Sequence, residues 1–438
     1  MKEKLQSLFD KRNIKQTLLN SAYILFLLAL LYRLTLKLFS PYKYLDWSIS
    51  EFLINYQAGF VRRGITGEIL FFFAKNFNID LILTIKVISL ICFFAMCTFF
   101  ISAFLKKGYS LYILPLCFFL GSPILSGYWI RKDCLMICIF LLTLWVYNKS
   151  NLKKLFKVIF INILSVFIIL THEVYAFIAF PILLVLFWNM YHKTGNYKSI
   201  IFAFISLSPG IFAFILTIIM HGDQETAQAI WDSWSIILNQ SPSKVESHNA
   251  IGSLGWGTKH AFNHHINNNF LAIDKNIAAL VIWCITFPTV YYISTNALLV
   301  FRKTEAIFTS KHKMVLSSIL IFQLLCLSPV FALLSCDYIR MFFYWIASSF
   351  AVFLIIPLDK IERIIPSFFI VFINRLNDIL SNILFPRKTT LVLLMLFLGI
   401  STYSFVLDLA FTSSMIYNIL TILSYTLKLL FYLLRFIF

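Results

Sequence analysis

The stretch "DLILTIKVISLICFFAMCTFFISAF", residues 80–104, decides the class of fold. Its charged residues are Asp80 and Lys86, and it is long enough for a helix to cross the roughly 30 Å hydrocarbon core of a bilayer. Because backbone polar groups in that core find no water, they must pair within the protein, which favours a helix. The stretch therefore predicts a transmembrane helix.

Similar runs recur along the chain of 438 residues, of which 60% are hydrophobic and 13% are charged. This composition is far more apolar than that of a soluble domain. We expect one integral membrane domain, residues 1–438, folded as an all-α polytopic bundle of about 11 or 12 spans. The expected spans lie near residues 17–39, 80–104, 109–121, 134–148, 155–170, 174–190, 199–220, 276–300, 314–334, 341–357 and 389–410, and 415–437 is either a twelfth span or an interfacial segment.

The charges of the connecting segments predict the orientation. The basic N-terminal residues precede an apolar run without a small-residue cleavage site, so we expect an uncleaved anchor. With a cytoplasmic N-terminus, the cytoplasmic segments, including a loop at 359–388, carry about twice as many lysines and arginines as the opposite segments. The net charge of +18 is therefore a topology signal and not a nucleic-acid footprint. The opposite side holds a first outer loop, 41–79, and a large outer loop, 221–275.

Five polar clusters fall on that outer side, at span ends or in loops. Ionisable groups near bilayer depth are costly and mark functional sites. Their accumulation on one face is the strongest functional signal in the sequence and predicts an outward-facing cleft. The clusters are Asp46 to Glu68, "GYWIRKD" at 127–133, "THE" at 171–173, "HNAIGSLGWG" at 248–257 and "CDYIR" at 336–340.

The first cluster contains the paired arginines Arg62 and Arg63 between Gly59 and Gly64. Glycine bends can expose backbone N–H groups to an anion, and the arginine fork matches phosphate oxygens. The alternative is that both arginines extend to lipid headgroups. The phosphate loop of nucleotide hydrolases is only half matched, because Ile65 replaces its lysine. We expect the pair to bind a phosphate-bearing lipid, with Gly64 at a positive φ.

Three residues are candidates for activating a sugar hydroxyl. Asp46 could take its proton or could cap a helix, and Glu51 could hydrogen-bond the same sugar. His172, with Glu173, could act as a proton shuttle. Alternatively, His172 and Glu173 are a buried pair that ties two helices together.

Two further pairs are candidate substrate ligands. Arg131 and Lys132 begin a span, where they would contact phosphate or ordinary headgroups, and Asp133 is expected to pair with one of them or cap the helix. Asp337 and Arg340 are three residues apart, so on a helix they share a face and can form a salt bridge. In the functional interpretation Arg340 is a second phosphate ligand that Asp337 orients.

Trp256 stands among glycines in the large outer loop, where it could stack on a sugar or anchor the loop at the interface. His260 and His264 have a spacing that can ligate metal on a helix, but no third ligand accompanies them. The eight cysteines show no metal or redox spacing. We expect no metal and no cofactor.

The order of these motifs, an acidic residue after the first span, then "GFVRRG", "RKD", "HE" and "DxxR", resembles that of bacterial O-antigen and capsule repeat-unit polymerases. The chain is more distantly similar to type C glycosyltransferases. The resemblance implies glycosyl transfer between undecaprenyl-diphosphate-linked oligosaccharides at the periplasmic face of the inner membrane, without nucleic acid. It also implies membrane lipids and a chain-length regulator protein as partners. Asp46 holds the place of the base in type C enzymes, and Arg62, Arg63 and Arg340 are candidate phosphate ligands.

Two other functions remain open. A type C enzyme would use a lipid-phosphate sugar donor. A flippase or transporter of the lipid-linked glycan would also need basic residues, but it is expected to line a cavity open to both sides and often shows internal repeats, of which the sequence has none that we detect. A membrane scaffold would not need charges at so many outer span ends.

Overall fold

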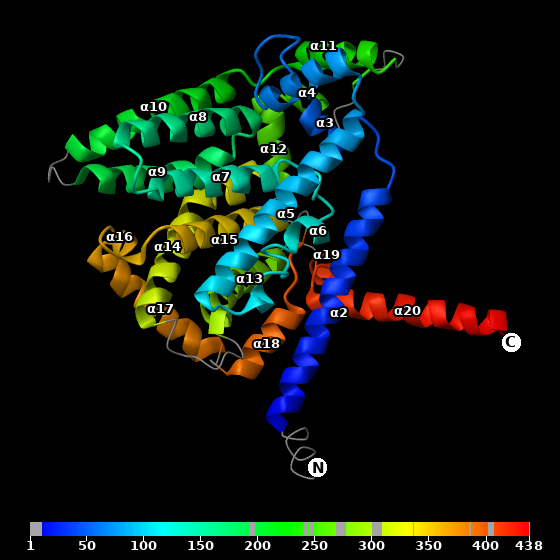
Figure 1. Ribbon diagram of the computed structural model, residues 1–438, viewed down its shortest axis with the longest axis vertical. Helices are drawn as coiled ribbons and strands as arrows, with labels where there is room; N and C mark the ends of the chain where they lie inside the picture. Colours follow the sequence, from blue (N-terminus) through cyan, green and yellow to red (C-terminus); the bar gives the residue numbers. More distant parts are fainter. Residues whose placement is uncertain are drawn as a thin grey trace.

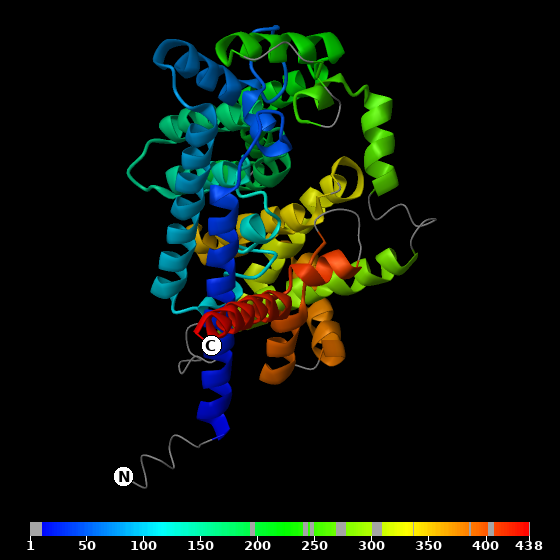
Figure 2. The same ribbon diagram turned by 90° about the vertical axis from the view of Figure 1, so that its right-hand side faces the viewer.

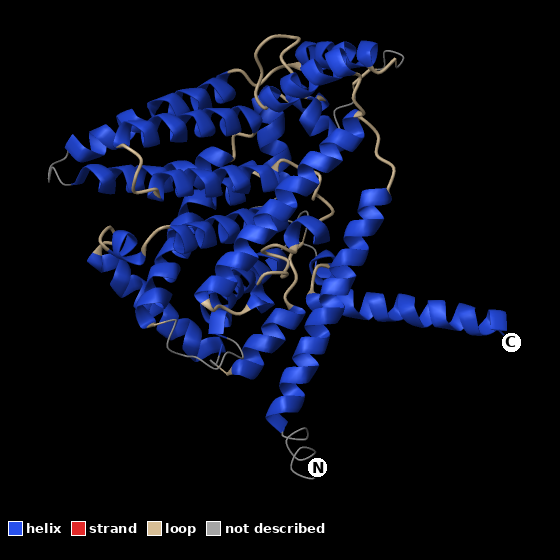
Figure 3. Cartoon of the chain, viewed as in Figure 1, coloured by secondary structure: helices blue, strands red, loops and turns tan. Residues whose placement is uncertain are grey.

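The computed structural model describes residues 11–192, 198–239, 244–245, 249–268, 277–299, 309–335, 337–384, 387–401 and 407–437. Helices dominate these ranges, and no strand occurs within them (Figure 3). The expected all-α class is therefore confirmed. Residues 1–10 of the predicted anchor, and His248 and Cys336 of two polar clusters, lie outside the described residues.

Seven helices of the described chain are long and apolar enough to cross a membrane. The chain is therefore a multi-pass membrane protein. The seven are α2 (Lys11–Phe39), α5 (Leu81–Lys107), α8 (Lys154–Thr171), α10 (Lys198–Ile219), α14 (Ser310–Pro329) with its continuation Val330–Leu334, α15 (Tyr338–Ile355) and α17 (Ser367–Leu384). Four other apolar helices are α7 (Asp133–Asn148), α9 (Tyr175–Tyr191), α18 (Lys388–Phe397) and α20 (Met415–Ile437), and the expected span at 276–300 contains α13 (Ile277–Asn296).

Helix α15 forms the centre of the bundle. In the 18-residue apolar stretch of α15, 89% is buried inside the protein, against 22% of the corresponding stretch of α2 at the periphery. The small residues Ser348, Ser349 and Ala351 of α15 are fully buried, which lets neighbouring helices approach closely. Helices α7 and α14 pack against α15, and α8, α9 and α10 lie side by side beyond α7 (Figure 1). The bundle therefore surrounds the helix that begins beside Asp337.

The expected span at 109–121 is wrong. The chain forms a short 3₁₀ turn (Leu111–Ile113) and then folds back on itself before α6 (Ser122–Leu125). The N–H of Leu120 donates to the carbonyl of Leu114 at 2.8 Å, and a side chain on Gly121 would come within 1.9 Å of the carbonyl oxygen of Pro115. The segment is apolar because it is buried inside the bundle, where irregular backbone is tolerated at membrane depth.

The expected span at 389–410 is also wrong. Helix α18 ends at Phe397, the described residues 398–401 are not helical, and the next helix is α19 (Leu407–Thr412). The hydroxyl of Ser413 accepts the N–H of Ile400 at 2.7 Å, so the two sides of this interruption pack together. The N–H of Ile339 in α15 donates to the carbonyl of Ser401 at 3.2 Å. The hydroxyl of Ser122, from the other broken segment, donates to the carbonyl of Ile339 at 3.0 Å. Both interrupted segments therefore meet at the start of α15.

The prediction of a loop at 359–388 is wrong, because most of this segment is helical: it contains nearly all of α16 (Leu358–Glu362) and the whole of α17. One side of α17 buries Ile373 and Leu380, while Phe368, Phe372 and other apolar side chains are exposed. The last apolar helix, α20, contacts α2 and projects away from the bundle (Figure 1). Whether α20 spans the bilayer or lies along it stays a prediction.

The two predicted outer loops pack against each other at one end of the molecule, at the top of Figure 2. The first loop forms α3 (Trp47–Leu53) and α4 (Gly64–Phe77), and the second forms α11 (Gln224–Ile237) and α12 (Thr258–Asn268). The indole N–H of Trp234 donates to the carbonyl of Leu53 at 2.6 Å. The N–H of Ala250 donates to the hydroxyl of Ser50 at 3.0 Å. These bonds hold α3 and the large loop together, as expected for segments on one side of the membrane.

Candidate functional site

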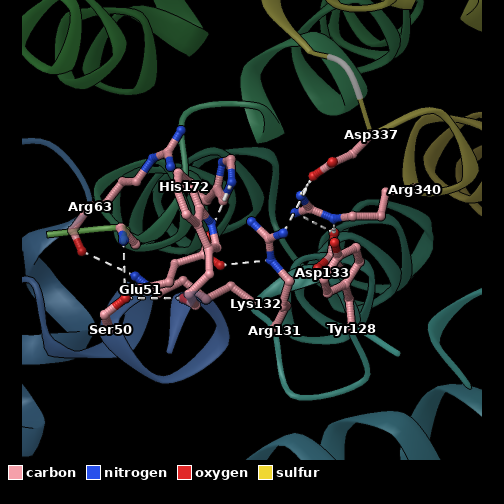
Figure 4. Close-up of polar contacts among 12 residues, drawn as sticks. Ser50, Glu51, Arg63, Tyr128, Arg131, Lys132, Asp133, His172, Asp337 and Arg340 are labelled. Carbon is pink, nitrogen blue, oxygen red and sulfur yellow. Dashed lines mark hydrogen bonds and ion pairs between the residues drawn. The ribbon is translucent and has the colours of Figure 1, made fainter. Parts of the chain in front are cut away.

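Side chains from four of the five polar clusters meet in one ion network (Figure 4). They come from α3, the bend before α4, the start of α7, the α8–α9 turn and the start of α15, which are far apart in sequence. These clusters therefore lie together in space, and their location on the outer face of the membrane stays a prediction. The network consists of Glu51, Arg63, Arg131, Lys132, Asp133, His172, Glu173, Asp337 and Arg340.

Arg131 occupies the middle of the network and is only 5% exposed. Its Nε lies 2.9 Å from Oε2 of Glu51, and its Nη1 lies 3.4 Å from Oδ2 of Asp337. Burial opposes ionisation of Glu51, but the surrounding cations, first Arg131, outweigh burial and hold the pKa of this carboxyl below its ordinary value. Buried charges are tolerated only when they are paired in this way. The sequence predicts Asp46 as a base and Glu51 as a residue that hydrogen-bonds the sugar; of these two acids, the structure places Glu51 in the network.

Arg340 links α15 to α7. Its Nε donates to Oδ1 of Asp133 at 2.9 Å, and its Nη1 donates to Oδ2 of Asp337 at 2.7 Å. The expected Asp337–Arg340 salt bridge is confirmed. The expected pairing of Asp133 with Arg131 or Lys132 is wrong, because Asp133 pairs with Arg340 and also accepts the hydroxyl of Tyr344. Tyr344 follows Arg340 by one helical turn, a spacing that could have pointed to it.

His172 is buried within the network and is poorly suited to shuttle protons. Its Nε2 is 3.4 Å from Oε1 of Glu51, and its Nδ1 accepts the N–H of Val174 at 3.3 Å. Burial, reinforced by the charge of Arg63, lowers the pKa of His172 to about 3. The imidazole is therefore neutral at physiological pH, and it lies buried beside Glu51 of α3 in the α8–α9 turn.

Lys132 was expected to contact phosphate or a lipid headgroup, but it is buried and bonds to two backbone segments. Its fully buried Nζ donates to the carbonyls of Arg63 and Thr171, both at 3.2 Å. Burial lowers the pKa of Lys132 to about 7, and Glu51 partly offsets this effect. Lys132 therefore fixes the arginine bend against the end of α8.

The two adjacent arginines have different environments. Arg63 adopts a left-handed φ of 65° before α4, and its Nε lies 2.9 Å from Oε2 of Glu173. Arg62 forms no ion pair or side-chain hydrogen bond with any described residue, and its Nε is buried without a partner. Its backbone N–H donates to the carbonyl of Met220 at 3.0 Å, which fixes its position. Within the described site, Arg62 is therefore the arginine whose guanidinium N–H groups remain available to a ligand.

The expectation that Gly64 has a positive φ is wrong. On this bend the positive φ values belong to Gly59, at 101°, and to Arg63. Gly64 begins α4, and a Cβ there would lie 2.2 Å from Cε1 of Tyr56. Glycine is needed at this position because the Tyr56 ring lies against the backbone.

Gly64→Ala is therefore expected to lower the stability of the protein by about 1–3 kcal/mol through overpacking. Tyr56→Ala should relieve the clash, so the double variant should lose less than the sum of the two single variants. Gly257→Ala is the matched control, because a Cβ at Gly257 has no atom within 4 Å and its φ is not positive. Thermal unfolding in detergent measures these effects. Equal stability of Gly64→Ala and wild type would contradict the packing explanation.

The contacts do not bring Asp46 or Trp256 into the ion network. Oδ2 of Asp46 accepts the N–H of Lys43 at 2.8 Å, in an exposed turn before α3. The Trp256 ring lies 5.2 Å from that of His260 and 4.8 Å from that of His264, both on α12. Their predicted roles stay predictions.

Together the residues form a network of paired acidic and basic groups with a deep and a shallow layer. Glu51, Arg131 and Arg340 are at most 8% exposed, whereas Arg63, Glu173 and Asp337 are 17–18% exposed and lie at the accessible edge. Among the described residues, no group of three or more His, Cys, Asp and Glu side chains is placed to hold a metal ion. Comparison of the chain with protein-family models, with characterised proteins and with solved structures finds no match.

Proposed function

We propose that this chain is a membrane glycosyltransferase that joins lipid-diphosphate-linked oligosaccharide repeat units, as O-antigen and capsule polymerases do. The observation that carries the proposal is the uncommitted guanidinium of Arg62 at the accessible edge of a preorganised ion network. The motif order that resembles these polymerases supports it. The proposed location is the inner membrane of a bacterium, with a cytoplasmic N-terminus and a periplasmic site.

The diphosphate of the donor would bind Arg62. Arginine presents a planar fork that matches two phosphate oxygens, and this fork carries a full positive charge. The neighbouring Arg63 is neutralised by Glu173, so it adds to the field only weakly. Binding to Arg62 would compensate the charge that grows on the leaving diphosphate in the transition state.

Asp337 is the proposed base. Its contacts with Arg131 and Arg340 both use Oδ2, so Oδ1 is left for the acceptor, and the side chain is 17% exposed. In the proposed step, Oδ1 takes the proton of an acceptor sugar hydroxyl. The acceptor oxygen forms a bond to the anomeric carbon of the donor, and the bond from that carbon to the diphosphate oxygen breaks. The electron pair leaves with the lipid diphosphate, which Arg62 holds.

One observation favours a second candidate, a flippase of the same lipid-linked glycan. The two interrupted apolar segments meet at Ile339, close to Asp337 and Arg340. Broken helices that meet near charged groups are common at the binding sites of transporters. A type C transferase, which adds a single sugar, remains the third candidate on the resemblance alone.

Deletion of the gene tests these functions. Cells without a polymerase should still make and flip single repeat units, so their surface glycan should carry one unit and no ladder on a gel. Wild type should restore the ladder, whereas Asp337→Asn at matched protein level should not. Loss of all surface glycan with lipid-linked units trapped inside would favour the flippase. A ladder of normal length with one sugar missing from each unit would favour the single-sugar transferase.

A further inference from the structure

Helix α12 carries a polar group that the site described above does not use. Nδ1 of His265 is buried and has no hydrogen-bond partner among the described residues. Buried polar atoms are nearly always paired, so an unpaired one in a native structure calls for a ligand or an ordered water. The ring of His265 lies 5.7 Å from that of His264, which in turn faces Trp256.

The position of α12 brings His265 to the edge of the ion network. Helix α12 packs against Val330–Leu334, the continuation of α14 that ends three residues before Asp337. In Figure 2, α12 runs down toward this segment. The charges of Asp337, Arg63 and Arg62 all act on the imidazole. Nε of Arg62 and Nδ1 of His265 are thus buried without a hydrogen-bond partner among the described residues, and the ion pairs of Asp337 leave its Oδ1 unused.

We propose that His265 is a second diphosphate ligand, which donates a hydrogen bond from Nδ1–H to a phosphate oxygen held by Arg62. This inference rests on the proposed function only in its choice of ligand. Burial, with the nearby His264 charge, lowers the pKa of His265 to about 4, so the imidazole is neutral at pH 7. A neutral imidazole has one N–H to donate, and a phosphate oxygen of the diphosphate beside it gives that donor the partner that it lacks.

Binding of farnesyl diphosphate to the full-length protein in detergent tests the proposal without knowledge of the sugars. His265→Ala should weaken binding about tenfold, as expected for one lost hydrogen bond to a charged group. His265→Asn should largely retain binding, because its amide occupies the place of Nδ1. His265→Gln should not, because its amide reaches only to the place of Nε2. His260→Ala, on the same helix, is the matched control, and thermal unfolding should be unchanged in all four variants.

Inorganic pyrophosphate distinguishes the two sources of the diphosphate. Competition at concentrations similar to those of farnesyl diphosphate would mean that the site takes free diphosphate, and much weaker competition would mean that it takes a lipid-linked one. Equal binding by wild type and His265→Ala, or no binding by wild type, would overturn the role of His265. Binding that depends on His265, together with a normal glycan ladder in cells whose gene is deleted, would leave this inference standing and refute the proposed polymerase.

Discussion

Arg62→Lys is expected to remove most polymer while leaving the protein folded. Lysine keeps the charge but loses the planar fork, so the variant should lose about 2–3 kcal/mol of transition-state stabilisation, the value of a hydrogen bond to a charged group. No described side chain pairs with Arg62, so its replacement leaves no buried charge unpaired. Ladder length in cells, and the melting temperature of the purified variant, measure the two effects separately.

Arg63 is the matched control for this prediction, because it is adjacent and chemically identical. Arg63→Gln removes the partner of Glu173, so the melting temperature should fall, and polymer should fall only in proportion to folded protein. Arg63→Gln combined with Glu173→Gln should recover stability, since neither charge is then left alone. Normal ladders from Arg62→Lys at matched protein level would contradict the phosphate role of Arg62.

The membrane class and the long peripheral helices could be predicted from sequence because lipid contact demands continuous apolar runs. Helices α2, α5 and α10 lie where such runs lie. The same criterion fails at 109–121 and 389–410, since hydropathy measures apolar character and does not distinguish lipid from the interior of a protein. Both segments are interrupted and lie against the start of α15.

The sequence predicted which residues belong to the candidate site better than it predicted which of them pair with each other. Charges at the span ends identified Arg131, Asp337 and Arg340, and the local spacing predicted the Asp337–Arg340 bridge. The partner of Asp133 depends on how α7 packs against α15, which no local pattern encodes. The choice between Asp46 and Glu51 likewise depends on which side of the short helix α3 faces the bundle.

Glu51→Gln is expected to destabilise the protein by about 3–5 kcal/mol, because it leaves the charge of Arg131 buried with a weaker partner. Glu51→Gln with Arg131→Gln should be more stable than the single variant, since Asp337 keeps its second partner, Arg340. The folded pKa of Glu51 is depressed, so its stabilisation is complete above the unfolded value of about 4.3 and is lost as pH falls further. Thermal unfolding in detergent from about pH 6 down to about pH 2 should show that the variant loses less stability on acidification than wild type.

Asp46→Asn distinguishes the role of Asp46 from that of Glu51 in the first outer loop. Asp46 accepts one backbone N–H in an exposed turn, so its neutral replacement should change the free energy of unfolding by less than about 0.5 kcal/mol. If Asp337 is the base, Asp46→Asn should also retain the polymer ladder. A folded Asp46→Asn protein without polymer would instead assign the base to Asp46, as the resemblance to type C enzymes implies, and would require the exposed turn to reach the substrate. A larger loss of stability in Asp46→Asn than in Glu51→Gln would contradict the placement of Glu51 at the centre of the network.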